Sequence, residues 1–315
     1  MGGRAGRAGQ GGQVLLLLVA LLAALLLASL TLFSTGQLAL QRMRLGNAAD
    51  AAALSAAVSE ARALNFAASM NRAAIANEAA LAQSVSLRSW SAHMNRLLGN
   101  VGIVTRWLPY VGAVTEALRR FWAGFDRVLQ PGLLAAEAAH ALTLPAFAAA
   151  QELMLDGRGP AAAELARHSL RANLPAARLS RGGELLLARS AAAAPAFTLS
   201  YAGARRSRQR AVVLASLDAF TRLRNRRLEP PLAGALVRFE KRGGTELLGF
   251  EQWRAVDTFS LHTRSLGLLG GWSERTPLGW GAAAQGSSSR TRGRFGNSAR
   301  VNPRATRLAN AALRV

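Results

Sequence analysis

Cysteine is absent from the chain of 315 residues, which excludes a disulfide framework, a thiolate zinc site and a cysteine nucleophile. Proline is missing before Pro109, and residues 47–98 contain neither proline nor glycine. Because these residues are the strongest helix breakers, their absence predicts a long helix in the N-terminal half. Acidic residues are missing after Glu274, which predicts a basic C-terminal end.

Catalytic and metal-binding motifs are missing as well. The sequence has no HExxH, GxxxxGK[ST], GxSxG or GxGxxG, and its four histidines are too dispersed for a ligand set. The best catalytic candidate is the group Asp257, Ser260 and His262. Residues five apart in a strand point to opposite faces, so Asp257 and His262 are not expected to pair. We therefore expect no catalytic site, no metal site and no cofactor.

An apolar run of twenty residues without a charge, Val14–Phe33, is long enough to cross a bilayer core of roughly 30 Å. A cleaved secretory signal is the first alternative, because Arg4 and Arg7 precede the run, but the run is long for a signal and no A-x-A-like site follows it. A prepilin-like leader is the second, because Gly12-Gln13 precedes the run, but Leu17 stands where such leaders carry glutamate. We expect an uncleaved membrane anchor.

The net charge is +22, and most of it is distal. Residues 1–33 carry +2, residues 34–155 carry +3 and residues 156–315 carry +17. Lys241 is the only lysine among 39 basic residues, a bias that a GC-rich genome produces without selection for phosphate binding. Charges flanking the apolar run are nearly balanced, so the positive-inside rule only weakly favours a cytoplasmic N-terminus.

Residues Leu40–Leu98 are predicted to form a long alanine-rich helix. Its charges form no opposite-sign pairs at i,i+3 or i,i+4, so another helix is expected to cover it; the alternative is that alanine is simply the best helix former. A seven-residue spacing defines a narrow seam for a partner helix. The seam comprises Leu40, Asn47, Leu54, Ala61, Ala68, Ile75 and Ala82, with Asp50 beside it.

Small residues at i, i+4 and i+8 of the apolar run, Ala20, Ala24 and Ala28, suit close packing of membrane helices. Polar residues also interrupt the long helix, and they are either specificity contacts or, as we favour, solvated. These are Asn47, Asp50, Asn65, Asn71, Arg72 and Asn77.

Residues 99–155 have a helical pattern, in which Arg106 and Pro109 argue against a second membrane crossing. Glu116 with Arg119 and Arg120 indicates a solvated helix face. The aromatic residues of this region belong either to a membrane surface or to a core, and we favour the core. They are Trp107, Tyr110 and Trp122.

The run Asp156–Pro160 predicts a boundary, followed by a small α+β domain. Leu236–Glu240 and Thr245–Thr263 are expected to form a hairpin whose turn is the intervening KRGG, and Ala196–Tyr201 is a further candidate strand. From Gly281 the chain becomes rich in glycine, serine and arginine, which predicts a flexible basic tail.

Two arginine clusters, RRSRQR and RLRNRR, predict a patch that attracts phosphate or another anionic partner. Nearby aromatic residues are few, so nucleic-acid stacking is not favoured, and a solvated basic surface is the simpler interpretation. The cluster residues are Arg205, Arg206, Arg208, Arg210, Arg222, Arg224, Arg226 and Arg227.

Residues Gly12 to Ala57 resemble the N-terminal region of the TadE/TadG-like proteins of Tad, or Flp, pilus assembly. The resemblance rests on Gly12-Gln13 before the apolar run, on Arg42 and Arg44 after it, and on the run Asn47–Ala53. The segments ALNFAASMNRAAIANEAALAQ, WRAVDTFSLH and LGWGAAA are also similar to longer TadG-related proteins.

The resemblance implies a non-enzymatic inner-membrane protein with a cytoplasmic N-terminus and a periplasmic bulk, acting as a minor pilin-like or assembly subunit beside other pilus components. The expected fold is mainly α and then α+β. Its expected divisions are a cytoplasmic N-terminus at 1–13, a transmembrane helix at 14–33, a long helix at 34–98, a helical region at 99–155, an α+β domain at 156–280 and a tail at 281–315. An envelope-anchored basic domain that binds DNA or anionic polymer is the alternative function.

Overall fold

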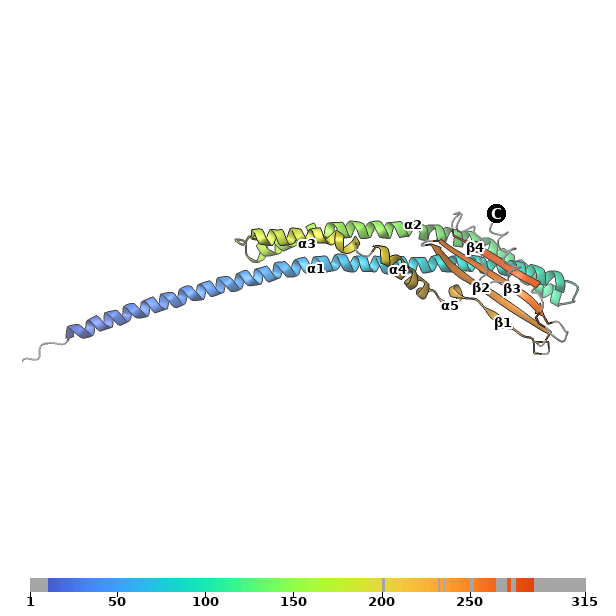
Figure 1. Cartoon of the computed structure of the whole chain (residues 1–315), viewed down its shortest axis with the longest axis horizontal. Helices are drawn as coiled ribbons and strands as arrows, with labels where there is room; N and C mark the ends of the chain where they lie inside the picture. Colours follow the sequence, from blue (N-terminus) through green and yellow to red (C-terminus); the bar gives the residue numbers. More distant parts are fainter. Residues whose placement is uncertain are drawn as a thin grey trace, which may run out of the picture. The chain divides into compact units, whose positions relative to one another are not determined.

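A computed structural model describes residues 11–199, 202–231, 233–234, 236–249, 252–264, 271–272 and 276–285. Helices precede a small antiparallel sheet, as expected from the sequence, and Figure 1 labels each element. The helices are α1 (Gly11–Thr105), α2 (Val111–Asn173), α3 (Arg181–Leu199), α4 (Ala202–Ser216) and α5 (Ala219–Arg222). The strands are β1 (Arg226–Leu228), β2 (Val237–Gly249), β3 (Gln252–Thr263) and β4 (Thr276–Ala284).

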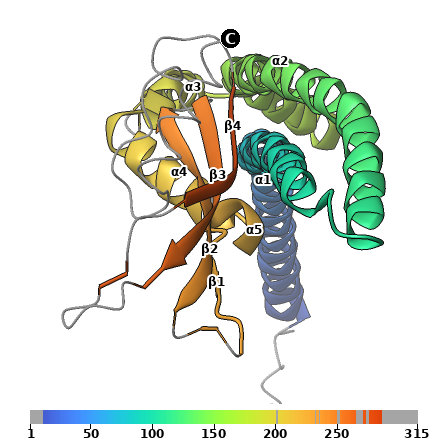
Figure 2. The same cartoon turned by 90° about the vertical axis from the view of Figure 1, so that its right-hand side faces the viewer.

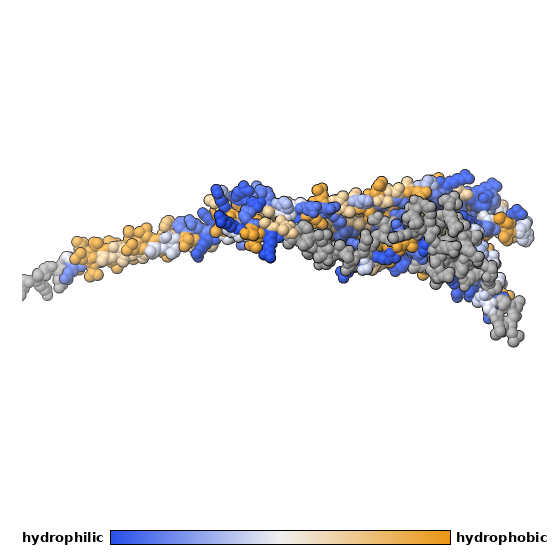
Figure 3. Space-filling view, turned by 45° about the horizontal axis from the view of Figure 1, so that its top comes forward, coloured by the Kyte–Doolittle hydropathy of each residue, from blue (hydrophilic) through white to orange (hydrophobic). Residues whose placement is uncertain are grey.

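Helix α1 joins the predicted membrane span and the predicted alanine-rich helix without a break, which confirms a long apolar N-terminal helix. The side chains of the apolar run are exposed along its whole length, as Figure 3 shows for the first part of the helix. Within the described part of the chain, two helices, α1 and α2, are long and apolar enough to cross a membrane; the window in α2 is the less apolar and is partly buried. The sequence predicted only the first of them.

Helix α2 corrects two expectations for the middle of the chain. The run Asp156–Pro160 does not interrupt the helix, although glycine and proline there disfavour it by about 1 and 3 kcal/mol. Packing overrides propensity, because a Cβ on Gly159 would lie only 2.7 Å from the Cβ of Ala191, so this glycine lets α3 approach α2 closely. The candidate strand at 196–201 is also wrong, because Ala196 to Leu199 are the end of α3; residues 200 and 201 lie outside the described residues.

The chain divides into two compact units, and residues 1–64 with 155–196 form the first. Its small core pairs Ala48 and Ala52 of α1 with Ala166 and Leu170 of α2. Leu174, Ala177, Leu179 and Leu187 pack around this core. The alanines therefore allow close helix packing within the chain itself.

Residues 65–154 with 197–315 form the second unit. Its sheet has the order β1-β2-β3-β4 with every neighbour antiparallel. In this unit α1 lies between the sheet and α2, as Figure 2 shows. The core is built from Leu81 and Val85 of α1, Val213 of α4, and Leu247 and Trp253 of the sheet.

The predicted hairpin exists, but its predicted turn is wrong. The KRGG segment lies inside β2, where Gly243 is opposite Asp257 and Gly244 is opposite Val256. A Cβ on Gly243 would lie 2.5 Å from Oδ1 of Asp257, so this glycine serves close approach within the sheet and not a turn. The predicted tail also begins too early, because Gly281 to Ala284 belong to β4; residues 286–315 lie outside the described residues.

Candidate functional site

Asp257 of β3 lies at the centre of a buried ionic cluster between the sheet and α1. Arg224 donates from Nε to Oδ1 at 2.8 Å and from Nη2 to Oδ2 at 3.1 Å. Lys241 of β2 donates from Nζ to Oδ1 at 2.6 Å, and Ser89 of α1 donates from Oγ to Oδ2 at 2.7 Å. We call Asp257, Arg224, Lys241 and Ser89 the Asp257 centre; it connects α1, β2, β3 and the segment after α5.

The charge state of the Asp257 centre follows from competing effects. Burial works to raise the pKa of Asp257, but the positive charges and hydrogen bonds of Lys241 and Arg224 outweigh burial and hold this pKa below its usual range. Burial lowers the pKa of Lys241, and the carboxylate of Asp257 opposes that shift. A carboxylate with both oxygens occupied by donors is suited to holding elements together rather than to proton transfer.

His93 lies one helical turn after Ser89, with only 2 % of its surface exposed. Burial, and then the charge of Lys241, lower the pKa of His93 to about 3, while Asp257 works in the opposite direction. Strand β4 passes directly over this turn of α1. A Cβ on Gly281 would overlap the backbone of Ser89 and His93, and one on Gly279 would lie 2.8 Å from the Cβ of Leu97. The two glycines therefore permit the contact between strand and helix.

Glu240 is a second buried carboxylate of β2. Arg242 lies 2.8 Å away, Arg238 3.1 Å, and Arg227 and the His262 ring 3.5 Å. Burial works to raise the pKa of Glu240, but these cations outweigh it, so the pKa is lowered. As expected, His262 and Asp257 do not pair with each other; His262 contacts Glu240.

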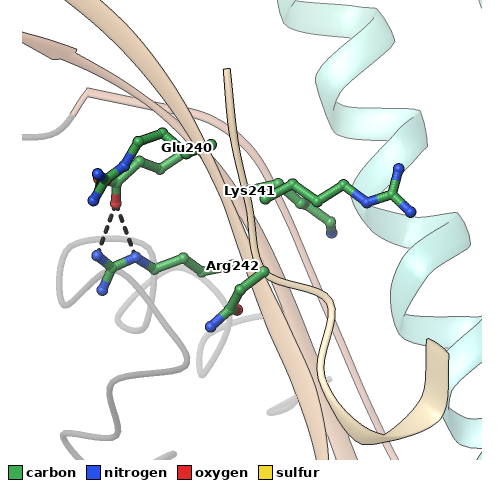
Figure 4. A pocket seen from close by; sticks show the side chains of 6 residues that line it. Glu240, Lys241 and Arg242 are labelled. Atoms are coloured by element: carbon green, nitrogen blue, oxygen red, sulfur yellow. Dashed lines mark hydrogen bonds and ion pairs between the residues drawn. The ribbon is translucent and has the colours of Figure 1, made fainter. Parts of the chain in front are cut away.

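An open hollow of about 370 Å³ lies beside β2. In Figure 4, Glu240 and Arg242 lie on one side of the strand and Lys241 points to the other side. The hollow offers positive charge to a small anion, but three of its cations, Arg227, Lys241 and Arg242, already pair with carboxylates. Its lining residues are Asn225, Arg226, Arg227, Glu240, Lys241 and Arg242.

The structure does not gather the predicted arginine patch into one free surface. Arg224 is buried on Asp257, and Arg222 donates to the carbonyl oxygens of Ala215 and Leu217. Arg210 donates to the carbonyl oxygen of Leu247, and Arg227 faces Glu240. Arg208 and Arg226 are exposed. Arg205 and Arg206 lie outside the residues whose side chains are described.

The alanine-rich part of α1 has two opposite faces. Ala48, Ala52 and Ala63 are buried by the chain itself, and Ser55 Oγ lies 3.2 Å from Ser169 Oγ of α2. Ala63 follows Leu54 by nine positions, which is two and a half turns at about 3.6 residues per turn, so the buried face and the seam point in opposite directions. The exposed residues Leu40, Asn47, Leu54, Ala61 and Ala68 form what we call the outward seam.

The far end of the predicted seam requires a correction. Ala82 is buried in the core of the second unit and Ile75 packs against that core, so neither is available to a partner helix. Of the polar interruptions, Asn77 is buried and donates to the carbonyl oxygen of His140 at 2.8 Å, while Asn71 accepts from Gln151 at 2.9 Å. Asn47, Asp50, Asn65 and Arg72 are exposed, as are Ala20, Ala24 and Ala28.

The aromatic residues near the α1–α2 connection were expected in a core, which is wrong for two of them. Trp107 is 73 % exposed and Tyr110 is 88 % exposed. Trp122 packs edge-on against Trp90 with ring centroids 5.2 Å apart. The predicted ion pairs of Glu116 are confirmed, at 2.7 Å to Arg119 and 2.8 Å to Arg120.

The sequence did not reveal that Ser89, Arg224 and Lys241 belong to the Asp257 centre, or that His93 lies buried beside it. The available signal was Lys241, the only lysine in an arginine-rich chain. Lysine carries a compact charge at the end of a slim stem, whereas the planar guanidinium of arginine needs more room. Among the described residues, no group of three or more metal-ligating side chains could hold a metal ion.

Helix α1 begins with a long apolar segment and continues into close-packed alanine-rich helices, an arrangement that is consistent with membrane anchoring. Residues 12–59 match the family Tad, described as "Putative Flp pilus-assembly TadE/G-like". The match confirms the resemblance over the N-terminal segment and associates this segment with pilus assembly. Comparison with curated proteins and with solved structures gave no significant match.

Proposed function

We propose that the protein is a membrane-anchored, non-enzymatic subunit of a Tad/Flp-type pilus assembly or secretion machine, with its N-terminus in the cytoplasm and its bulk in the periplasm. The observation that carries the proposal is the composition of α1 over the matched residues 12–59. Its apolar run is uncovered, and the helix that follows buries one face on its own chain while presenting the outward seam on the other.

The outward seam gives the proposal a mechanism. Leu54, Val58 and Leu64 are exposed beside small alanines, so a second helix could approach closely and bury these side chains. The family match suggests that such a helix belongs to another pilus component. Binding of DNA or anionic polymer is less well supported, because Arg210, Arg222, Arg224 and Arg227 make contacts within the chain.

Photocrosslinking along α1 tests the proposed mechanism. A photoreactive residue at Leu54 is expected to give an adduct with a pilin-like or pilus-assembly membrane protein in intact cells, whereas the adjacent exposed position Ala53 is the matched control. Leu54→Glu should reduce assembly about tenfold or more, because burying a leucine stabilises an interface by about 1.5–3 kcal/mol. Equal adducts at Leu54 and Ala53, or an assembly unaffected by Leu54→Glu, would contradict the mechanism.

A further inference from the structure

Helix α2 carries an exposed apolar stripe along 43 residues of its length. Positions separated alternately by three and four residues are all apolar or glycine, and every one of them is exposed. The larger side chains include Phe121, Val128, Leu142 and Leu153, which expose 68 %, 75 %, 75 % and 79 % of their surface. We call this set the α2 stripe: Val111, Val114, Leu118, Phe121, Phe125, Val128, Gly132, Ala135, Ala139, Leu142, Ala146, Ala149 and Leu153.

The opposite face of α2 makes the polar contacts. Glu137 accepts from Arg88 of α1 at 2.8 Å, and Gln130 donates to the carbonyl oxygen of Arg88 at 3.2 Å. Asp126 accepts from Ser91 and Asn95 of α1. A surface helix usually faces its own core with apolar residues and the solvent with polar ones. Helix α2 departs from this arrangement, because an uncharged apolar stripe lies on its exposed face, and this face has the composition of an interface.

We propose that the α2 stripe is the surface on which a second copy of this chain packs, as a parallel two-stranded coiled coil. The alternating spacing of three and four residues averages 3.5, the period at which apolar residues stay on the contact line of two supercoiled helices. The parallel direction rests on the proposed function, because two copies anchored in one membrane point the same way.

The charge distribution permits a second copy as the occupant. Most of the net charge of +22 lies after residue 155, whereas residues 34–155, which contain the α2 stripe, carry only +3, so repulsion between two copies is weak there. The α2 stripe contains no charged residue. Every second stripe residue, from Leu118 to Ala146, is directly preceded by an exposed residue that is also uncharged. Two copies can therefore meet along this stripe without facing arginines. These flanking residues are Ala117, Gly124, Pro131, Ala138 and Pro145, all small or compact enough to admit a second backbone.

The size of the stripe also suits a stable dimer. Eight of its side chains are valine, leucine or phenylalanine. At roughly 100 Å² for each of them, two copies would bury about 1,600 Å², the usual size of a specific interface. The arrangement is self-complementary, because in a parallel two-fold pair each stripe residue meets the same residue of the other copy.

Single cysteines test the pairing directly, because the chain has none of its own. Val128→Cys and Leu142→Cys, each in the full chain in membranes, are expected to give disulfide-linked homodimers on mild oxidation. Ala141→Cys is the matched control, since Ala141 is also exposed but lies off the stripe. We expect about tenfold less dimer from this control, because α-helix geometry turns the adjacent residue about 100° away from the contact line.

Charged substitutions in the α2 stripe test the same pairing without an oxidation step. The double variant Val128→Glu and Leu142→Glu should convert the detergent-extracted dimer to a monomer by mass measurement, with unchanged far-ultraviolet circular dichroism, while Arg127→Glu should leave the dimer intact. A monomeric parent protein overturns the proposal. The proposal is also overturned if cysteines in the stripe form no dimer and yet do not react with a membrane-impermeant maleimide, because lipid would then cover the stripe. Either result leaves membrane anchoring by residues 14–33, and hence the proposed function, intact.

Discussion

Replacing Asp257 with alanine is expected to lower the free energy of unfolding by about 3–5 kcal/mol, because removing one partner of a buried ion pair leaves the others uncompensated. Arg224 and Lys241 would lose the carboxylate at 2.8 Å and 2.6 Å, and Ser89 would lose its acceptor. Urea unfolding followed by tryptophan fluorescence measures the effect, since Trp253 of β3 is fully buried.

Two comparison variants make the Asp257 result specific. Asp50→Ala removes an exposed carboxylate and should change the free energy of unfolding by less than about 0.5 kcal/mol. Adding Lys241→Met to Asp257→Ala should recover part of the lost stability, because the second change removes one stranded charge. A loss below about 1 kcal/mol for Asp257→Ala would show that the Asp257 centre contributes little to folding.

Acidification from pH 6.5 to pH 4.5 is expected to destabilise the protein through His93. The pKa of His93 is about 3 in the folded state, compared with the ordinary histidine value of 6.5 that applies in the unfolded state. Above pH 6.5 neither state holds the extra proton, whereas between pH 6.5 and pH 3 only the unfolded state binds it. Stability is therefore lost as the pH falls, by about 1.4 kcal/mol per unit, or about 2–3 kcal/mol over this window.

The variant His93→Gln isolates this effect, since glutamine does not titrate. Burial raises the pKa of Glu137, which acts in the opposite direction in the same window, so the quantity to compare is the difference between parent and variant. The stabilising charge of Asp257 is lost only below about pH 4, because its pKa lies below the usual value of 3.8. Parallel curves of unfolding free energy against pH for the two proteins would refute the assignment to His93.

The helical N-terminal half could be predicted because the relevant signals are local. The absence of proline and glycine from residues 47–98 and the uncharged run at 14–33 depend only on neighbouring residues. The two compact units do divide between Met154 and Leu155, close to the expected boundary, but helix α2 is not interrupted there. The continuous helix could not be predicted, because packing of Gly159 on Ala191 is a contact between helices that local propensity does not contain. The KRGG turn failed for a similar reason, since Gly243 makes room for Asp257 of the next strand.

The candidate surfaces could be predicted only in part. The seven-residue spacing selected Leu54 and Ala61, which are both exposed, but it could not show that the chain itself covers Ile75 and Ala82. The Asp257 centre brings together residues 89, 224, 241 and 257, whose proximity depends on strand register and on the path of α1. The contacts of the clustered arginines could not be predicted either, because charge in sequence does not show which guanidinium groups lie near carboxylates or carbonyl oxygens.

Membrane topology distinguishes a periplasmic bulk from a cytoplasmic one. One variant carries a single cysteine in place of Ala8, which precedes the apolar run, and another carries it in place of Trp107, which is 73 % exposed. A membrane-impermeant maleimide is added after only the outer membrane has been permeabilised. We expect labelling of Trp107→Cys while the inner membrane is intact, labelling of Ala8→Cys only after lysis, and a full-length protein. The reverse pattern would place the basic bulk in the cytoplasm, contradict the proposed pilus role and make nucleic acid the partner to test.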